Sequence, residues 1–260
     1  MRANRFPWGN LVLLVACAIF GVAASFPFVI SLYADKLADA PFPLPVVFGL
    51  ALLQNTVIFG VIVAIGLLLT AKVGLPGTPL IDDWRAGKGI GHRLRAIIQP
   101  ALMTGLGVGV AVLLLFSLVL RNEIPQLPVG KAVLIPIWRR FLLCFSGGLT
   151  EEIMMRIFLL SLLVWLLSKV WRSGTGARSR KVFWAANIIL AVIFGLGHLG
   201  SVVPLMPITF NIVLGALLLN GVASIAFTSL YVRRGLEAAI LAHFMADFMI
   251  WVIGPSFILR

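Results

Sequence analysis

The segment FLLCFSGGLTEEIMMRIFLLSLLVWLLSKVW, residues Phe141 to Trp171, largely decides the fold of this chain. It is long enough to cross a bilayer, since a helix needs about 20 residues to span roughly 30 Å of hydrocarbon. Two adjacent glutamates, Glu151 and Glu152, lie inside it, and Arg156 follows one helical turn later. Charged groups at membrane depth usually face a protein interior or a water-filled cavity, because losing hydration is costly. The segment therefore predicts a membrane helix that carries a functional site.

The rest of the chain repeats this apolar pattern. Of 260 residues 61% are hydrophobic and 12% are charged, whereas a soluble domain carries about 25% charged residues. Apolar runs separated by proline and glycine predict an all-α, polytopic transmembrane helical bundle with seven spans, or eight if Asn220-Gly221 breaks the sixth run. The runs are Leu11–Tyr33, Val46–Thr70, Ile97–Leu120, Phe141–Trp171, Val182–Leu199, Ile208–Val232 and Leu236–Ile253. We expect residues 1–260 to form a single integral membrane domain, with a motif-bearing core at about 138–255.

The basic residues indicate topology rather than nucleic-acid binding. The formal charge is +12, and basic patches can attract phosphates. Here the lysines and arginines are spread over the connections between apolar runs, and most fall on the cytoplasmic side if the N-terminus is cytoplasmic. That bias is the usual orientation signal of membrane proteins. We therefore expect membrane lipid as a partner and no nucleic acid, while no motif specifies an oligomeric state.

Several other residues have simpler expected roles. Cys17 and Cys144 lie within spans and are expected to be small packing residues rather than a disulfide. The Gly105-xxx-Gly109 spacing favours close packing of helices within the chain. Glu237 begins the seventh run and is expected to cap a helix or form an ion pair, because acids are favoured at helix N-termini.

Two further motifs place polar groups in apolar runs, Phe194 to His198 and His243 to Asp247. Residues four apart lie on one face of a helix, so each motif presents both of its residues in one direction. The third histidine of the chain, His92, lies in a basic connection and is expected to be solvated.

The same spacing lets Glu152 pair with Arg156, which lowers the cost of burying both charges. Glu151 points about 100° away from Glu152 and has no partner on its own helix. We therefore expect Glu152 and Arg156 to support the site and Glu151 to act as its general base.

If the three motifs converge, two mechanisms of water activation are open. A divalent metal such as zinc could be held by Glu151, His198 and His243 and generate hydroxide. Alternatively, Glu151 and His198 could deprotonate water without a metal, with His243 and residue 247 stabilising the oxyanion.

A non-enzymatic protein is the competing interpretation. Buried Glu, His and Asp residues also build proton relays, so a proton-coupled transporter or a peptide-binding membrane scaffold would use the same residue types. A transporter should contain repeats and paired broken helices, and the sequence has no convincing repeat.

The ordered motifs Glu-Glu-x-x-x-Arg, Phe-x-x-x-His and His-x-x-x-Asn, or similar, give the chain a family resemblance. In Glu151-Glu152-Ile-Met-Met-Arg156 and the two histidine motifs, the C-terminal half resembles the CPBP family of intramembrane proteases, also called the CAAX-prenyl protease type II or Abi family. The resemblance implies an intramembrane endopeptidase in the bacterial inner membrane, with metalloendopeptidase chemistry if a metal is bound. Its implied substrate is a membrane-associated peptide or protein, such as a prenylated CAAX-type tail or a bacteriocin or leader peptide.

The resemblance also implies roles for individual residues. Glu151 and His198 would activate water, and His243 with residue 247 would stabilise the tetrahedral intermediate, while Glu152, Arg156 and Phe194 would be supporting residues. The family commonly has asparagine where this chain has Asp247. A carboxylate donates a hydrogen bond only when protonated, so metal ligation or orientation of His243 are alternative roles for Asp247.

Overall fold

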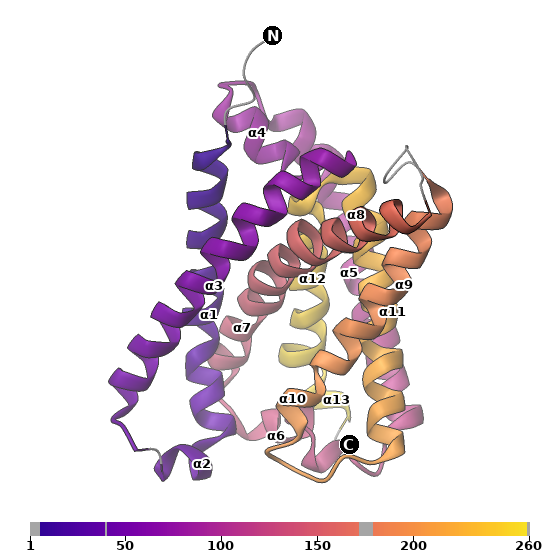
Figure 1. The fold of residues 1–260 in the computed structure, drawn as a ribbon. Coiled ribbons are helices and arrows are strands. Elements are labelled where there is room, and N and C mark those ends of the chain that lie inside the picture. Colours follow the sequence, from indigo (N-terminus) through magenta and orange to yellow (C-terminus); the bar gives the residue numbers. More distant parts are fainter. Residues whose placement is uncertain (1–5, 40, 172–178, 259–260) are drawn as a thin grey trace.

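The computed structural model describes residues 6–39, 41–171 and 179–258 as a bundle of helices (Figure 1). Within these residues seven helical segments are long and apolar enough to cross a membrane, which confirms the predicted all-α, polytopic bundle. Arg2, Arg5 and residues 172–178, which contributed to the predicted orientation, lie outside the described residues. The spans are α1 (Trp8–Leu32), α3 (Leu44–Val73), α5 (Gly91–Val119), the α7–α8 segment (Ile137–Val170), α9 with α10 (Arg180–Val202), α11 (Phe210–Arg234) and α12 with η6 (Leu236–Ile253).

The alternative of an eighth segment is not found within the described residues, because α11 continues through Asn220 and Gly221 without a break. The Asn220 side-chain amide donates to the carbonyl oxygen of Ala216 one turn earlier, at 2.9 Å. An amide satisfied in this way does not need to interrupt an apolar helix. The other differences lie at helix ends, as at Gly91, where α5 begins before the predicted Ile97.

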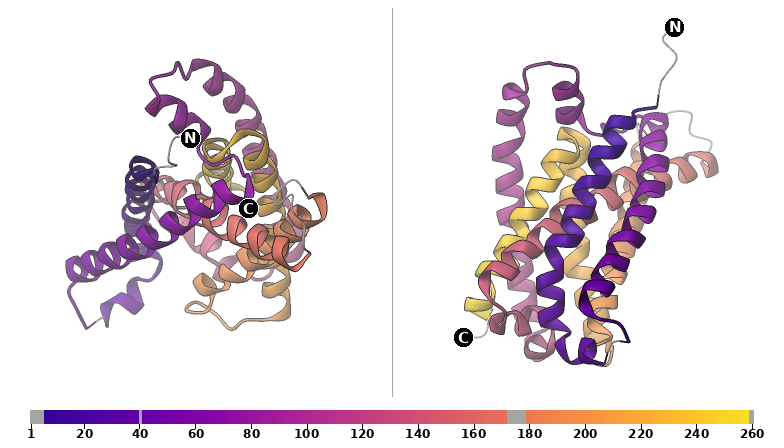
Figure 2. Two further views of the ribbon diagram at one scale, coloured as in Figure 1. Left: turned by 45° about the horizontal axis from the view of Figure 1, so that its top comes forward. Right: turned by 90° about the vertical axis from the view of Figure 1, so that its left-hand side faces the viewer.

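Short elements connect the spans. They are α2 (Ala34–Ala38), α4 (Pro79–Arg85), η1 (Ile124–Gln126), α6 (Pro128–Lys131), η2 (Ala132–Leu134) and α13 (Pro255–Ile258). Figure 2 shows α4 at the end of the bundle where α5 begins. The Glu237 carboxylate accepts hydrogen bonds from the backbone N–H groups of Leu80 and Ile81, at 3.0 and 2.9 Å. Glu237 therefore has the predicted capping role, but it caps α4 rather than its own helix.

The segment that carries Glu151 and Glu152 forms one helical path from α7 (Ile137–Phe145) to α8 (Ser161–Val170), and it crosses the bundle diagonally in Figure 1. Between them, η3 (Ser146–Glu151) and η4 (Ile153–Leu160) have π-helical hydrogen bonding. Such turns are rare and frequently occur at functional sites. A Cβ atom on Gly147 of η3 would collide with a carboxylate oxygen of Asp247, so the missing side chain allows η3 to approach α12 (Leu236–Asp247).

Glycines also permit the close packing of α5 on α12. A Cβ atom at Gly105 would collide with the backbone oxygen of Ala242, and one at Gly109 would collide with the Met249 side chain of η6 (Phe248–Ile253). The expected packing of these glycines within the chain is confirmed. Cys17 and Cys144 are free thiols, as predicted.

Candidate active site

A completely buried ion pair forms the foundation of the site. Arg156 donates to both carboxylate oxygens of Glu152, with Nε–Oε2 and Nη2–Oε1 distances of 2.8 and 3.0 Å, as the four-residue spacing predicted. Its remaining terminal nitrogen donates to the hydroxyls of Ser224 and Thr228 on α11, at 3.3 and 2.7 Å. Buried charges are tolerated when such bonds compensate for lost hydration. The network therefore joins η4 to α11 at a fixed position.

The same carboxylate orients His243 on α12. The Nδ1 atom of His243 lies 2.9 Å from Glu152 Oε1, and because a carboxylate bonded to arginine is an acceptor, Nδ1 carries the hydrogen. The imidazole stacks on the Phe227 ring, with centroids 4.8 Å apart. These contacts fix the ring so that Nε2 faces Glu151, 3.9 Å from its Oε2 atom.

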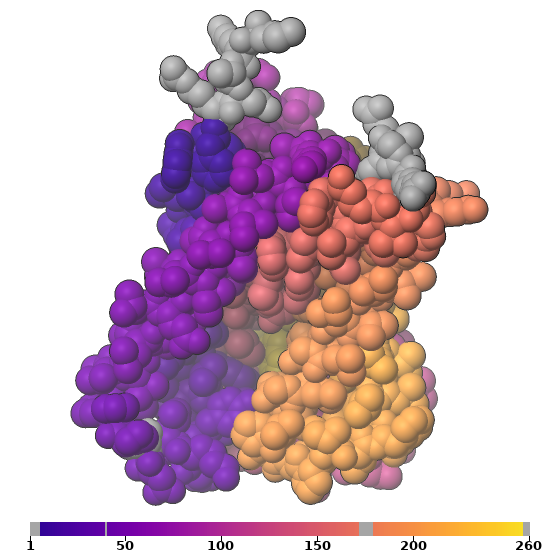
Figure 3. Space-filling model, in the orientation of Figure 1, coloured from indigo at the N-terminus to yellow at the C-terminus, as the bar shows by residue number. Residues whose placement is uncertain are grey.

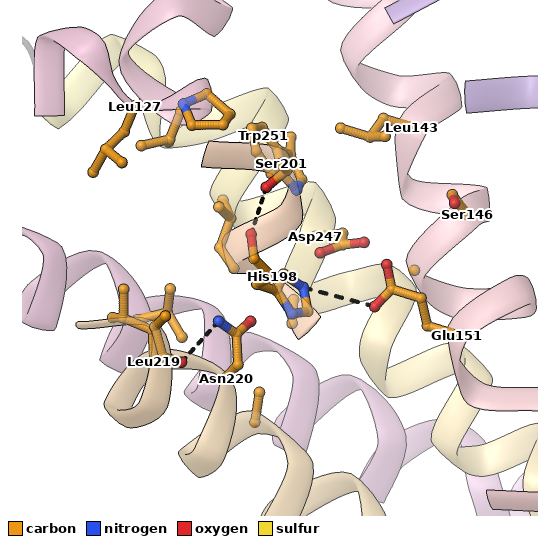
Figure 4. Close-up of a pocket in the computed structure, with 18 of the residues that line it drawn as sticks. Leu127, Leu143, Ser146, Glu151, His198, Ser201, Leu219, Asn220, Asp247 and Trp251 are labelled. Carbon is orange, nitrogen blue, oxygen red and sulfur yellow. Dashed lines mark hydrogen bonds and ion pairs between the residues drawn. The ribbon is translucent and has the colours of Figure 1, made fainter. Parts of the chain in front are cut away.

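His198 is held in a similar way at the end of α9 (Arg180–Gly197), just before α10 (Leu199–Val202). Its Nδ1 atom lies 2.8 Å from the carbonyl oxygen of Phe194. A carbonyl only accepts hydrogen bonds, so Nδ1 again carries the hydrogen and Nε2 presents a lone pair. This Nε2 atom also lies 3.9 Å from Glu151 Oε2, and Figure 4 shows the two side chains pointing toward each other.

Glu151 differs from its neighbour Glu152 because its buried Oε2 atom has no hydrogen-bond partner among the described residues, whereas both oxygens of Glu152 accept hydrogen bonds. Both histidine Nε2 atoms, at 3.9 Å, are too distant for direct hydrogen bonds but close enough to share a water molecule with the carboxylate. Glu151 Oε2 and His198 Nε2 are acceptors for the two hydrogens of such a water, and His243 Nε2 is a third acceptor when its imidazole is neutral and a donor when it is protonated. The arrangement is therefore complementary to a bound water.

Asp247 lies beside this group, with Oδ1 3.8 Å from the Nε2 atom of His243. The three motifs that were recognised separately in the sequence thus come together from η3, α9 and α12. As an ionised group Asp247 is a further acceptor, so the immediate surroundings of Glu151 are rich in acceptors and poor in fixed donors.

These residues line a cavity of about 290 Å³ whose walls are mostly apolar. Space-filling Figure 3 shows the molecule hollowed between α3 and the α9–α10 segment, with α12 at the floor of the hollow. At the rim, the Tyr33 hydroxyl donates to the backbone oxygen of Ser201 at 2.8 Å, joining the end of α1 to α10. The apolar walls include Phe28, Leu32, Val112, Phe116, Leu120, Ile212 and Ile250.

Sequence reasoning missed several polar side chains of the cavity, among them Asn220. Asn220 is the only carboxamide among the described residues that line the cavity, and Figure 4 places it across the cavity from Glu151. One N–H bonds to Ala216, which leaves the second N–H available. A signal was present in the sequence: Asn220, Ser224 and Thr228 follow one another at intervals of four in an apolar run, which places them on one helix face.

The residue types expected for a zinc site are present, but their atoms are farther apart than the ligands of one zinc ion. Among the described residues, no group of three or more histidine, cysteine, aspartate or glutamate side chains could hold a metal ion. The Glu151 oxygen and either imidazole nitrogen are 3.9 Å apart, whereas two ligand atoms at about 2.0–2.2 Å from one tetrahedral zinc are separated by about 3.4 Å. Glu151, His198 and His243 would therefore have to move slightly closer together to hold a zinc ion, and the steps proposed below describe what these side chains do themselves.

The fold and the site together define an integral membrane protein with an acid–imidazole centre facing an internal cavity. Comparison with known families then identifies the core: residues 133–249 match the type II CAAX prenyl endopeptidase Rce1-like family. This match covers the three motifs and confirms the resemblance seen in the sequence. No curated protein and no solved structure matches the chain. At the level of the family, the match over residues 133–249 supports an intramembrane endopeptidase that acts on a peptide substrate.

Proposed function

We propose that the chain hydrolyses a peptide bond in a membrane-associated substrate, with Glu151 as the general base that activates water. The observation that supports this proposal most strongly is the geometry around Glu151 Oε2. This unpaired oxygen lies 3.9 Å from two imidazole nitrogens that are both oriented by hydrogen bonds on their far side. A general base must reach the proton that it removes, directly or through one water.

In the proposed reaction, the water oxygen attacks the carbonyl carbon of the scissile peptide bond. One water proton passes to Glu151 while the other hydrogen bonds to His198 Nε2, which holds the nucleophile in place. The tetrahedral intermediate then collapses with cleavage of the C–N bond, and the protonated Glu151 returns its proton to the leaving nitrogen. Water is consumed, and a new carboxyl terminus and a new amino terminus are formed.

The oxyanion of this intermediate needs hydrogen-bond donors. A protonated His243 carries an Nε2–H that can donate, which is the role implied by the family resemblance. An ionised Asp247 repels the oxyanion, so we propose that the free N–H of Asn220 supplies the amide donor. Asp247, 3.8 Å from His243 Nε2, would then orient the imidazole.

The apolar cavity favours a substrate that carries a hydrophobic group close to the cleaved bond, since burying apolar surface is favourable. We propose a prenylated CAAX-type C-terminal tail as the substrate, with an unmodified leader or bacteriocin peptide as the alternative. Cleavage of a matched pair of peptides, with and without the prenyl group, distinguishes the two classes.

We further propose that the protein resides in the bacterial inner membrane with its N-terminus in the cytoplasm. The end of the bundle that carries α4 contains most of the described lysines and arginines, including Lys72, Arg85, Lys181 and Arg233. Positive residues are retained on the cytoplasmic side. Cysteine-labelling of single-cysteine variants in spheroplasts would reveal the opposite orientation if labelling at Arg180→Cys required no permeabilisation.

The proposed function is tested by cleavage of a peptide library with purified full-length protein in lipid nanodiscs. Wild type should cleave at least one membrane-associated peptide, and Glu151→Gln should not. If the library contains a verified substrate that Glu151→Gln cleaves at the wild-type rate, the general-base role is wrong. A protein that binds such peptides without cleaving them would instead be the peptide-binding scaffold.

Metal dependence is tested with the same preparation. Elemental analysis is combined with activity before and after dialysis against a chelator. Activity that survives complete metal removal supports the direct acid–imidazole mechanism. Activity that is lost and then restored by zinc supports a metal held by Glu151, His198 and His243.

A further inference from the structure

A second cavity, of about 240 Å³, lies at the α4 end of the bundle and shares no lining residue with the active-site cavity. It lies between the linker that precedes α4, the first turns of α5 and the last turn of α11. Its lining contains three arginines and a histidine but no aspartate or glutamate. The lining residues are Pro76, Pro79, Leu80, His92, Arg93, Ala96, Ile97, Arg233 and Arg234.

The walls of this basic cavity are fixed by hydrogen bonds between separate helices. The backbone of Gly77 accepts from Leu236 N–H at 3.0 Å, and its own N–H donates to the Tyr231 hydroxyl at 3.3 Å. Glu237 Oε1 binds the N–H groups of Leu80 and Ile81. The linker is thus attached to the junction of α11 and α12, so the concave surface exists before any ligand binds.

The cationic side chains of the cavity are only partly neutralised. Arg93 donates through Nε to Asp83, which also pairs with Lys88. Among the described residues, the terminal nitrogens of Arg93 have no acidic partner. Arg233 and Arg234 are exposed and form no salt bridge within the described residues. Like charges gathered without counterions repel one another.

Two carboxylates near the cavity, those of Asp83 and Glu237, do not neutralise Arg233 and Arg234. Asp83 is engaged by Arg93 and Lys88. Glu237 Oε1 accepts from the start of α4, and its buried Oε2 atom forms no hydrogen bond with Arg233 or Arg234 within the described residues. The hydrogen bond and charge of Arg93 hold the pKa of Asp83 below its usual range, so Asp83 stays ionised and keeps Arg93 in position at neutral pH.

We propose that this cavity binds a phosphate group, carried by the headgroup of an anionic phospholipid or by a free phosphate. Arginine presents several N–H donors that match phosphate oxygens. Basic pockets between membrane helices on the cytoplasmic side are known to accommodate anionic headgroups. Pro76, Pro79 and Ile97 supply an apolar side beside the arginines, which suits a headgroup attached to acyl chains.

Thermal unfolding and native mass spectrometry of the full-length protein in nanodiscs test this proposal. Phosphatidylcholine nanodiscs are compared with nanodiscs that also contain phosphatidylglycerol, and inorganic phosphate is added to the former in a separate arm. The test variant is Arg233→Gln/Arg234→Gln, since both side chains are exposed and lack salt bridges. The control, Arg180→Gln/Lys181→Gln, removes the same charge from exposed positions at the same end, outside the cavity.

We expect phosphatidylglycerol to raise the unfolding temperature of wild type and of the control, and to remain bound to both. Its affinity for the test variant should fall about thirty-fold, since each arginine near an anionic lipid contributes a factor of about five. Equal melting of all three proteins in phosphatidylcholine alone establishes that the variants fold.

The other outcomes are equally informative. If inorganic phosphate stabilises wild type as much as phosphatidylglycerol does, and the test variant loses both effects, the ligand is free phosphate rather than lipid. If the test and control variants lose the lipid effect equally, or if neither ligand stabilises wild type, the cavity is not a phosphate site. Peptidase activity is not part of this measurement, so its outcome is independent of the proposed reaction.

Discussion

Glu151 and Glu152 are neighbours in the sequence, yet their surroundings are opposite. Both oxygens of Glu152 are bonded to Arg156, one of them also contacts His243, and the side chain is completely buried. The Glu151 side chain is 29% exposed and has an oxygen without a partner among the described residues. Consecutive residues on a helix point to different sides, so one glutamate faces the packed helices and the other faces the cavity.

The comparison separates two uses of a carboxylate inside a membrane. Glu152 stabilises the arrangement of η4, α11 and α12 because three protein hydrogen bonds compensate for its lost hydration. An unpaired acceptor such as Glu151 Oε2 costs free energy, and this cost is compatible with a role in which the oxygen receives a proton. The pair therefore predicts that one glutamate governs catalysis and the other governs stability.

The largest expected effect is on catalysis. Glu151→Gln keeps the size of the side chain but removes the base, and the rate of peptide cleavage should fall by about 10²- to 10⁴-fold. The unfolding temperature should stay close to that of wild type, because the lost oxygen has no protein partner. Cleavage kinetics and thermal unfolding are measured on the same preparation. A large loss of stability would show that Glu151 has a structural role like that of its neighbour.

Glu152→Gln should mainly reduce stability, and it should also slow cleavage because Glu152 orients His243. It leaves the Arg156 guanidinium buried without its counterion, and breaking such a pair costs about 3–5 kcal/mol. Unfolding in a denaturant series should detect this loss. The double variant Glu152→Gln/Arg156→Met removes both charges and should recover part of the stability. If Glu152→Gln is as stable as wild type, the ion pair does not have the importance assigned to it.

Asn220, which lines the cavity together with Glu151, provides a test of the proposed oxyanion site. Asn220→Ala should reduce the cleavage rate by about 10²- to 10³-fold, the usual effect of losing one oxyanion donor, with little effect on unfolding. In this background Asp247→Asn should restore part of the rate, because it returns an amide donor near His243. A wild-type rate for Asn220→Ala, or no recovery in the double variant, would contradict the proposed role of Asn220.

The membrane spans could be predicted from sequence because each is an apolar run bounded by polar or helix-breaking residues. Helix ends were less accurate where charged residues continue a helix beyond the hydrocarbon region, as Arg93 and Arg95 do in α5. The π-helical turns of η3 and η4 had no apolar signature, since they change the hydrogen-bond pattern but not the composition.

Within the candidate site, spacing on one helix was informative and contacts between helices were not. The Glu152–Arg156 pair followed from a four-residue interval, and it is present in the structure. By contrast, the bond between Glu152 and His243 joins residues 91 positions apart, which no local pattern encodes. Thr228 was missed for the same reason, since its partner lies on another span.

The smallest expected effects are on the free energy of unfolding, when either of the two hydroxyls that bond to Arg156, those of Thr228 and Ser224, is removed. Thr228→Val preserves shape but removes a 2.7 Å bond to the guanidinium, and hydrogen bonds to charged groups contribute about 1.5–3 kcal/mol. The Ser224 bond is longer, 3.3 Å, so Ser224→Ala should cost about 1 kcal/mol or less. Denaturant unfolding of both variants measures this difference.

The same two variants should have only a small effect on catalysis. Because these bonds hold the guanidinium rather than the water, cleavage should slow by less than about ten-fold in either variant. A cleavage rate that falls by more than this would mean that the buried network also positions the reacting groups. Glu151 and Glu152 would then not divide catalysis and stability between them as fully as their hydrogen bonding indicates.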